Sequence, residues 1–347
     1  MLRDGEEKGL DHTALVAKNA SQGFGHGHFD KLSWQLYDNG QEIIRDYGAA
    51  RFLNIEAKEG GRYLPENESW AKSSIAHNTL VVNEQSHFGG DVKLADQHAP
   101  TQLYFTDTNA LQATTATIDS AYPDTGTAFT RTLAMVSLEG LSAPVIIDVV
   151  RASGGKGEAQ YDLPLHYNGH IMQVGFETDK NVTARPVLGE ANGYQHIWVD
   201  AIGRPQGDKN FLTFLKDGRF YTYRFAAKDG LQSILAESGA NDPNFNLRRQ
   251  PIIIQRMKSA GGASFVSMLE SHGLYDGATE QTIESNSQIA SLDHYQQGGC
   301  DIVKVTTLAG KSALLAISYD QDPTKTHTVK YGGKDVVWQG FMALVEP

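Results

Sequence analysis

The sequence predicts an all-β protein built from stacked antiparallel β-sheets. β-Branched and aromatic residues alternate with polar ones along many short segments, and Gly, Asn and Asp separate these segments. Two Asn-Gly or Asp-Gly pairs stand between such segments, where a two-residue hairpin turn needs positive φ. No segment sustains an apolar period of about 3.6 residues, which argues against long helices.

Two hairpins are the clearest elements. The segment "SWQLYDNGQEIIRDYG" (33–48) carries Asn39-Gly40 at its centre, and "LTFLKDGRFYTYRF" (212–225) carries Asp217-Gly218. Both pairs favour the type I′ turn, whose backbone twist matches that of the flanking strands. Further strands are expected over 78–83, 103–107, 111–118, 128–137, 144–152, 196–202, 251–258, 264–269, 301–308, 313–319 and 335–345.

The C-terminal part is expected to form a separate, smaller sheet. The Gly-, Asn- and Ser-rich stretch 271–299 contains no strong strand signal and is read as the passage to that sheet. We therefore expect an antiparallel sandwich domain over 1–270 and a smaller sheet subdomain over 271–347, which could be continuous with the first.

Composition excludes several classes of protein. The chain has 347 residues and a net charge of -11, so nothing in it suggests a nucleic-acid partner. No apolar run approaches the roughly 20 residues of a membrane span, so no membrane partner is expected. A single cysteine, Cys300, excludes an internal disulfide and a cysteine-rich zinc site. The N-terminal segment "MLRDGEEKGLDH" lacks the apolar core of a signal peptide.

The stretch "GHGHFDKL" (25–32) contains two histidines that need an explanation. Together with residues downstream, His28, Asp46 and His77 form a set of two histidines and one carboxylate, which suits zinc with one open position. Capping or core histidines are the alternative from spacing alone. A straight hairpin would hold residue 28 roughly 16 Å from Asp46, so a metal site requires 28–33 to leave the ladder and fold back. The spacing of Phe29 and Leu32 allows one helical turn there.

Two long strings carry a family resemblance. "QGFGHGHFDKLSWQLYDNGQEIIRDYGAARF" and "GGRYLPENESWAKSSIAHNTLVVNEQSHFGG" resemble the alginate lyases of polysaccharide lyase family 17, in the heparinase II/III-like superfamily. The similarity is dense over about 22–90 and general afterwards. It implies an exo-acting oligoalginate lyase. Members join an N-terminal (α/α)-toroid to antiparallel sheets, with the active site between them, so the resemblance implies that this chain is the sheet half and that its toroid partner is missing here.

The resemblance also implies roles for individual residues. The metal is expected to be zinc in a mainly structural role, with calcium or another divalent metal as the alternative. The family's metal triad maps onto His28, Asp46 and His77. Its sheet-side catalytic residues map onto His26, Arg51 and Tyr63, and substrate-binding residues onto His26, Arg51 and Arg62.

These residue types suit β-elimination at a 4-linked uronate. Arg51 and His26 can offset the substrate carboxylate, which makes the neighbouring C5 proton easier to remove. Tyr63 could be the base if positive charge lies close to it, and it could equally be the acid at O4. A packed loop aromatic is the alternative for Tyr63.

Other readings of the whole chain stay open at this point. A heparin- or chondroitin-type lyase and a non-catalytic carbohydrate-binding sandwich with a structural metal are the alternatives. The full-length parent is expected in the periplasm or secreted, and a homodimer is compatible with the resemblance.

Overall fold

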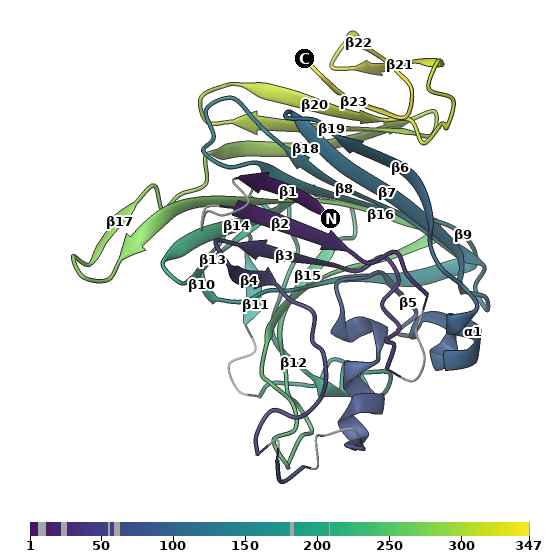
Figure 1. Cartoon of the computed structure of the whole chain (residues 1–347), viewed down its shortest axis with the longest axis vertical. Coiled ribbons are helices and arrows are strands. Elements are labelled where there is room, and N and C mark those ends of the chain that lie inside the picture. Colours follow the sequence, from purple (N-terminus) through teal and green to yellow (C-terminus); the bar gives the residue numbers. More distant parts are fainter. Residues whose placement is uncertain are drawn as a thin grey trace.

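The computed structural model of the chain describes residues 1–5, 12–21, 26–54, 56–58, 63–180, 184–207 and 209–346. Stacked antiparallel sheets dominate it, so the predicted all-β class is confirmed (Figure 1). Within the described residues the one α-helix, α1 (Val92–Asp96), has five residues. No helix in this part of the chain is long and apolar enough to cross a membrane.

The largest sheet has thirteen strands and forms the middle of the molecule. Its main path runs through β10 (His170–Val174), β13 (Phe211–Lys216), β14 (Arg219–Phe225), β16 (Pro251–Asp276), β9 (Val145–His166), β8 (Thr127–Val136), β7 (Leu111–Tyr122) and β6 (Thr101–Asp107). Five further strands of this sheet pair outside the main path: β5 (Val81–Val82), β11 (Thr178–Lys180), β12 (Ile197–Gly203), β15 (Gln232–Ser238) and β17 (Gln281–Ile283).

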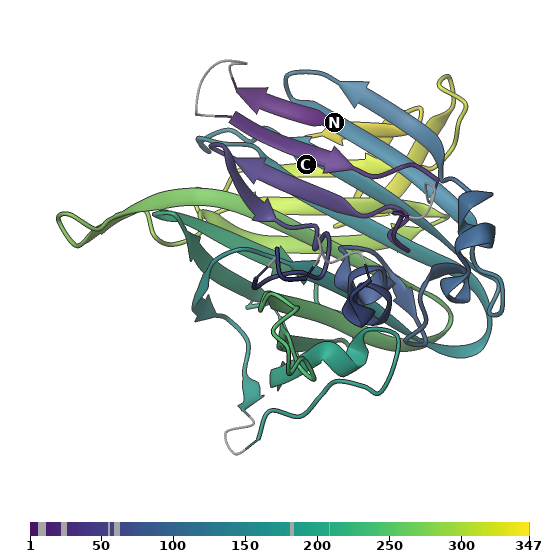
Figure 2. The same ribbon diagram turned by 60° about the horizontal axis from the view of Figure 1, so that its bottom comes forward.

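Smaller sheets lie on either side of the large one. The first contains β1 (Leu2–Gly5), β2 (His12–Ala17), β3 (Trp34–Asp38) and β4 (Gln41–Ile44). The second contains β18 (Ile289–Gln297), β19 (Cys300–Thr307), β20 (Ser312–Ile317) and β23 (Met342–Val345), and a two-stranded ribbon of β21 (Thr326–Tyr331) and β22 (Lys334–Gln339) accompanies it. Figure 2 shows the layer β1–β4 in front of the large sheet.

The alternating direction of side chains along β9 explains why one small sheet packs on each face of the large sheet. Side chains of successive strand residues point to opposite faces of a sheet. Accordingly Ile146 and Val150 enter the apolar core shared with the layer β1–β4, whereas Ile147 and Val149 enter the core shared with β18–β20. The continuous apolar run of this segment is thus that of a strand buried on both faces.

The predicted strands 251–258 and 264–269 are one strand, β16. The residues between the two predicted strands continue the pairing with β9 through a bulge between Ala260 and Gly262. Gly262 has φ +132°, and a Cβ there would lie 2.2 Å from the carbonyl oxygen of Ala152. Glycine at this position therefore allows two backbones to approach closely.

The prediction for 271–299 was wrong. This stretch contains the end of β16 and all of β17 and β18. Much of this region is exposed and carries polar residues. It therefore lacks the alternation of apolar and polar residues by which a strand is recognised in a sequence. The division of the chain at residue 270 stays a prediction: β16 runs through that position, while the β18–β20 sheet begins at Ile289.

Two fully buried histidines predict acid sensitivity. Burial lowers the pKa of both His87 and His166 to about 4, whereas an unfolded histidine titrates near 6.5. As pH falls below 6.5 the unfolded chain takes up these protons first, so stability is lost between about 6.5 and 4. Each histidine should cost about 2 kcal/mol at about pH 5 relative to neutral pH.

Urea unfolding of the wild type and of His166→Gln, at neutral pH and at about pH 5, measures this effect. Glutamine can keep a donor toward the Ile75 carbonyl, which the imidazole Nε2 contacts at 2.9 Å. The variant should therefore lose less stability in acid than the wild type. His170→Gln, at an exposed histidine, is the matched control, and an unchanged pH slope in His166→Gln would contradict the prediction.

Candidate metal centre and catalytic face

The hairpin that leads to the candidate site has the predicted turn. Asn39 and Gly40 have φ of 50° and 73°, as a type I′ turn requires. The ladder starts in the register that a two-residue loop at Asn39-Gly40 sets, with Tyr37 opposite Glu42. It then shifts so that Leu36 lies opposite Ile44. This shift and the start of β3 at Trp34 leave residues 28–33 outside the ladder, as a metal site requires.

The expected helical turn in 28–33 is absent. Leu32 instead adopts φ 59°, and the backbone N–H of Ser33 donates to the carbonyl of Asp30 at 3.0 Å. The chain therefore reverses in a tight turn. Leucine rarely takes positive φ, and here its side chain is 2 % exposed in the main apolar core. Burial of Leu32 thus accompanies the reversal, and no sequence rule for turns predicts leucine in this place.

Four side chains converge beside this turn. One ligand atom from each of His28, Asp30, Asp46 and His77 lies within 4.8 Å of all the others. His77 Nδ1 and Asp46 Oδ1 are 2.5 Å apart, and the rings of His28 and His77 are 5.0 Å apart between centroids. The structure thus brings the three predicted ligands together and adds Asp30, which the sequence analysis did not select. Its position two residues after His28, in the segment that had to fold back, was the available signal.

The protonation states of the cluster suit a cation. Burial lowers the pKa of His28 to about 4, and the charge of His77 adds to this effect, so the imidazole is neutral at pH 7. Burial acts to raise the pKa of Asp46, but the adjacent His77 outweighs it and lowers that pKa well below its usual range. Burial likewise acts to lower the pKa of His77, and Asp46 raises it overall. A metal ion would take the place of the proton shared by this pair.

Contacts around the cluster meet the requirements of a metal site. His77 is fully buried, and its Nε2–H donates to the carbonyl of Ala71 at 3.0 Å, which leaves Nδ1 to face the cluster. Metal-binding histidines are held by such a second hydrogen bond. Asp30 is 1 % exposed; its Oδ2 pairs with Lys18, and its Oδ1 has no hydrogen-bond partner within the described residues. A buried carboxylate oxygen without a partner is costly unless a cation or water satisfies it.

The predicted catalytic residues are on the surface. His26 and Arg51 are exposed, and Tyr63 is 83 % exposed in the described part of the chain. Arg62 lies outside the described residues. The segment after Arg51 is attached to a distant loop, because the N–H groups of Phe52 and Leu53 donate to the carbonyls of Asn246 and Phe245. These two hydrogen bonds fix the backbone that follows Arg51 against the loop around residue 245.

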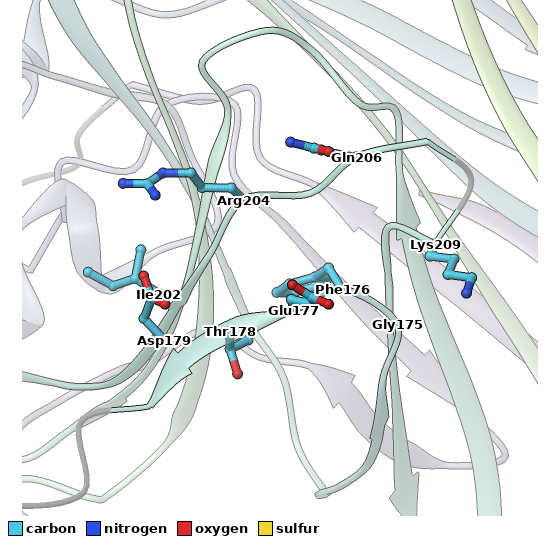
Figure 3. Close-up of a pocket in the computed structure, with 9 residues that line it drawn as sticks. All are labelled: Gly175, Phe176, Glu177, Thr178, Asp179, Ile202, Arg204, Gln206 and Lys209. Atoms are coloured by element: carbon cyan, nitrogen blue, oxygen red, sulfur yellow. The ribbon is translucent and has the colours of Figure 1, made fainter.

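A separate pocket of about 460 Å³ lies elsewhere on the molecule (Figure 3). The charged side chains that line it have mixed signs: Arg204 and Lys209 are cationic, and Glu177 and Asp179 are anionic. None of the predicted site residues lines it. We therefore place the candidate functional site at the metal cluster and not at this pocket. The pocket is lined by Gly175, Phe176, Glu177, Thr178, Asp179, Ile202, Arg204, Gln206 and Lys209.

Two curated relatives are similar to the chain over nearly all its length. An "Alginate lyase" from Stenotrophomonas maltophilia (strain K279a) is 46% identical over 346 residues, which are 100% of this chain and 46% of the relative. An "Exo-oligoalginate lyase" from Saccharophagus degradans (strain 2-40) is 46% identical over 342 residues, which are 97% of this chain and 46% of the relative. The chain thus spans about half the length of these relatives.

Solved structures with the same fold are more distant in sequence. The heparan sulfate lyase HepC from Pedobacter heparinus superposes with a TM-score of 0.56 at 14% identity, covering 89% of this chain and 40% of that one. A heparinase III superposes with a TM-score of 0.56 at 12% identity and the same coverage. At this identity the likeness shows the fold alone. The family described as "Heparinase II/III-like, C-terminal" matches residues 2–289, and the chain belongs to that family.

Proposed function

We propose that this chain is the β-sheet part of an alginate lyase that removes residues from the ends of oligoalginate. One observation carries the proposal: two relatives named as alginate-degrading lyases are 46% identical to the chain over 97–100% of its length. The heparan sulfate lyase HepC and the heparinase III share the fold at only 14% and 12% identity, which supports glycosaminoglycan substrates far less.

The reaction that suits these residues is β-elimination. A base takes the C5 proton of a 4-linked uronate, the C–H electrons form the C4=C5 double bond, and the C4–O4 bond breaks. An acid delivers a proton to the departing O4. In this proposal Arg51, His26 and Arg62 bind the sugar carboxylate and offset its charge, because C5 becomes acidic only when that charge is neutralised. Tyr63 exchanges a proton with the substrate as base or acid.

The cluster of His28, Asp30, Asp46 and His77 would hold zinc. Two neutral-nitrogen donors and carboxylate oxygens form a common zinc donor set. The ion would supply a fixed positive charge that joins three segments of the chain. His26 is two residues from His28, and Arg51 is five residues from Asp46. A bound ion that fixes His28 and Asp46 would therefore also limit the movement of His26 and Arg51.

The active site is proposed to be shared with a further part of the same polypeptide, an N-terminal helical toroid. The supporting observation is that the chain spans 46% of each curated relative. Elimination needs a base, an acid and charge neutralisation within hydrogen-bond reach at once, and the sheet face offers only some of these groups. A periplasmic or secreted location of the parent is proposed with it, since oligoalginate is an extracellular polysaccharide fragment.

The proposal is tested by joining this chain to the part of the Stenotrophomonas maltophilia relative that it does not match. The joined protein should release unsaturated monosaccharide from oligomannuronate or oligoguluronate, detected by the ultraviolet absorbance of the new double bond. Heparan sulfate oligosaccharides serve as the competing substrate. Faster cleavage of heparan sulfate than of oligoalginate would overturn the substrate assignment, and binding without cleavage of either would favour a carbohydrate-binding module.

A further inference from the structure

Asn78 follows His77 directly, is 1 % exposed and uses its whole side-chain amide in hydrogen bonds. One N–H donates to the carbonyl of Trp34 at 2.9 Å and the other to the carbonyl of Arg45 at 2.7 Å. The amide oxygen accepts from the backbone N–H of His166 at 2.7 Å. Two carbonyls and one N–H match the two donors and one acceptor sites of an amide. No other side chain of this size offers that combination.

The partners of Asn78 belong to the segments that carry the candidate ligands. Arg45 immediately precedes Asp46, so the bond to its carbonyl ties the Asp46 segment to the residue that follows His77. Trp34 is the first residue of β3 and ends the turn that contains Asp30. A single buried amide therefore joins all three ligand-bearing segments. Neighbouring side chains add to this arrangement, because Thr79 Oγ1 donates to the carbonyl of Lys31 at 2.5 Å.

Arg131 on β8 attaches this arrangement to the large sheet. Its side chain is 3 % exposed, and its Nε and one terminal nitrogen donate to the two oxygens of buried Asp148 at 2.8 and 2.5 Å. The other terminal nitrogen donates to the carbonyl of Leu32 at 2.9 Å and to the carbonyl of Asn78. Asp148 thus orients a guanidinium that holds the backbone on both sides of the metal cluster.

We propose that Asn78 is the positioning residue of the metal centre and that Arg131 anchors it. Asn78 would set the spacing between the donor atoms of Asp46 and His77, while Arg131 holds the turn that presents Asp30. The inference rests on the proposed zinc site. It explains why a fully buried amide and a buried ion pair lie next to the cluster, where apolar residues could otherwise fill the core. Both side chains are buried.

The test is the zinc affinity of the purified chain, measured by competition with a chelator. Asn78→Asp keeps the size of the side chain and the acceptor for His166. It removes the two N–H donors and puts a carboxyl group in place of the amide. Supporting groups of metal ligands typically contribute about 10–100-fold in affinity, so this variant should bind zinc about 10–100-fold more weakly. With cobalt in place of zinc, the visible spectrum of the variant should change, because the donor atoms are displaced.

A second variant covers the case in which Asn78→Asp does not fold. Arg131→Lys keeps a positive charge beside Asp148, but an ammonium cannot bond both carboxylate oxygens and two carbonyls with the same geometry. It should bind zinc about 10-fold more weakly. The matched control is Asn210→Asp, because Asn210 is also buried and donates to a backbone carbonyl, that of Gly207, at 2.6 Å. This control should lose stability and keep its zinc affinity.

The outcomes are distinct. If Asn78→Asp folds and keeps the zinc affinity and cobalt spectrum of the wild type, the inference is overturned and the zinc site stands. If Asn78→Asp does not fold, wild-type zinc affinity in Arg131→Lys has the same consequence. An equal loss of affinity in Asn210→Asp also overturns it, since the effect would then reflect stability alone. A wild-type chain that binds no zinc overturns the zinc site itself and the inference with it.

Discussion

Tyr63→Phe should abolish lyase activity in the joined protein while leaving its fold and zinc content unchanged. The substitution keeps the ring and deletes only the oxygen that carries a proton. Tyr63 is 83 % exposed, so the change creates no cavity and should not alter stability. A positioned acid or base typically contributes about 10²–10⁴-fold, and we expect a fall in kcat of that size.

The matched control for Tyr63→Phe is Tyr275→Phe, at a tyrosine of β16 that is 40 % exposed. The control should keep full activity. In the isolated chain, which we expect to be nearly inactive, neither substitution should change the residual rate. Efficient cleavage of oligoalginate by the isolated chain would show that the active site is not shared. Full activity of Tyr63→Phe in the joined protein would show that Tyr63 is not the proton-transfer residue.

His77→Ala should cost the chain its zinc and a large part of its stability. His77 is fully buried and lies within 4.8 Å of the other candidate donor atoms. Zinc that binds only the folded state stabilises it by on the order of 4 kcal/mol at a free concentration about 1,000 times the dissociation constant. Thermal unfolding and elemental analysis, with and without zinc, measure both losses.

A chelator separates the metal effect from the loss of the imidazole. Removing zinc from the wild type should lower its melting temperature by several degrees, on the order of 5–10 °C. The same chelator should not affect His77→Ala, which has no zinc to lose. Asp30→Asn tests the fourth member of the cluster: lower zinc affinity would assign Asp30 as a ligand, and unchanged affinity would leave the ion to the two histidines and Asp46. A wild type that contains no zinc and ignores the chelator would contradict the metal site.

Local sequence patterns were enough to predict the fold class and the first hairpin. Apolar and β-branched residues along β7, β8 and β9 indicate buried strands, and Asn39-Gly40 provides the backbone angles of its own turn. These signals are local, since each depends on a few neighbouring residues. The family resemblance likewise identified His28, Asp46 and His77 because they occur within two continuous strings of the sequence.

Only the tertiary structure decided how these residues meet. The chain reverses at Leu32, a residue with no turn propensity, and its side chain is buried between sheets that come from distant parts of the chain. Asp30 joins the cluster as a result of that reversal. The role proposed for Asn78 and Arg131 depends on partners up to 99 residues away in the sequence. Every residue has a backbone carbonyl, so the identity of the accepting residue does not indicate that its carbonyl accepts a hydrogen bond from a side chain. The sequence by itself thus determined which side chains are available for the chemistry, and packing between the sheets determined their geometry.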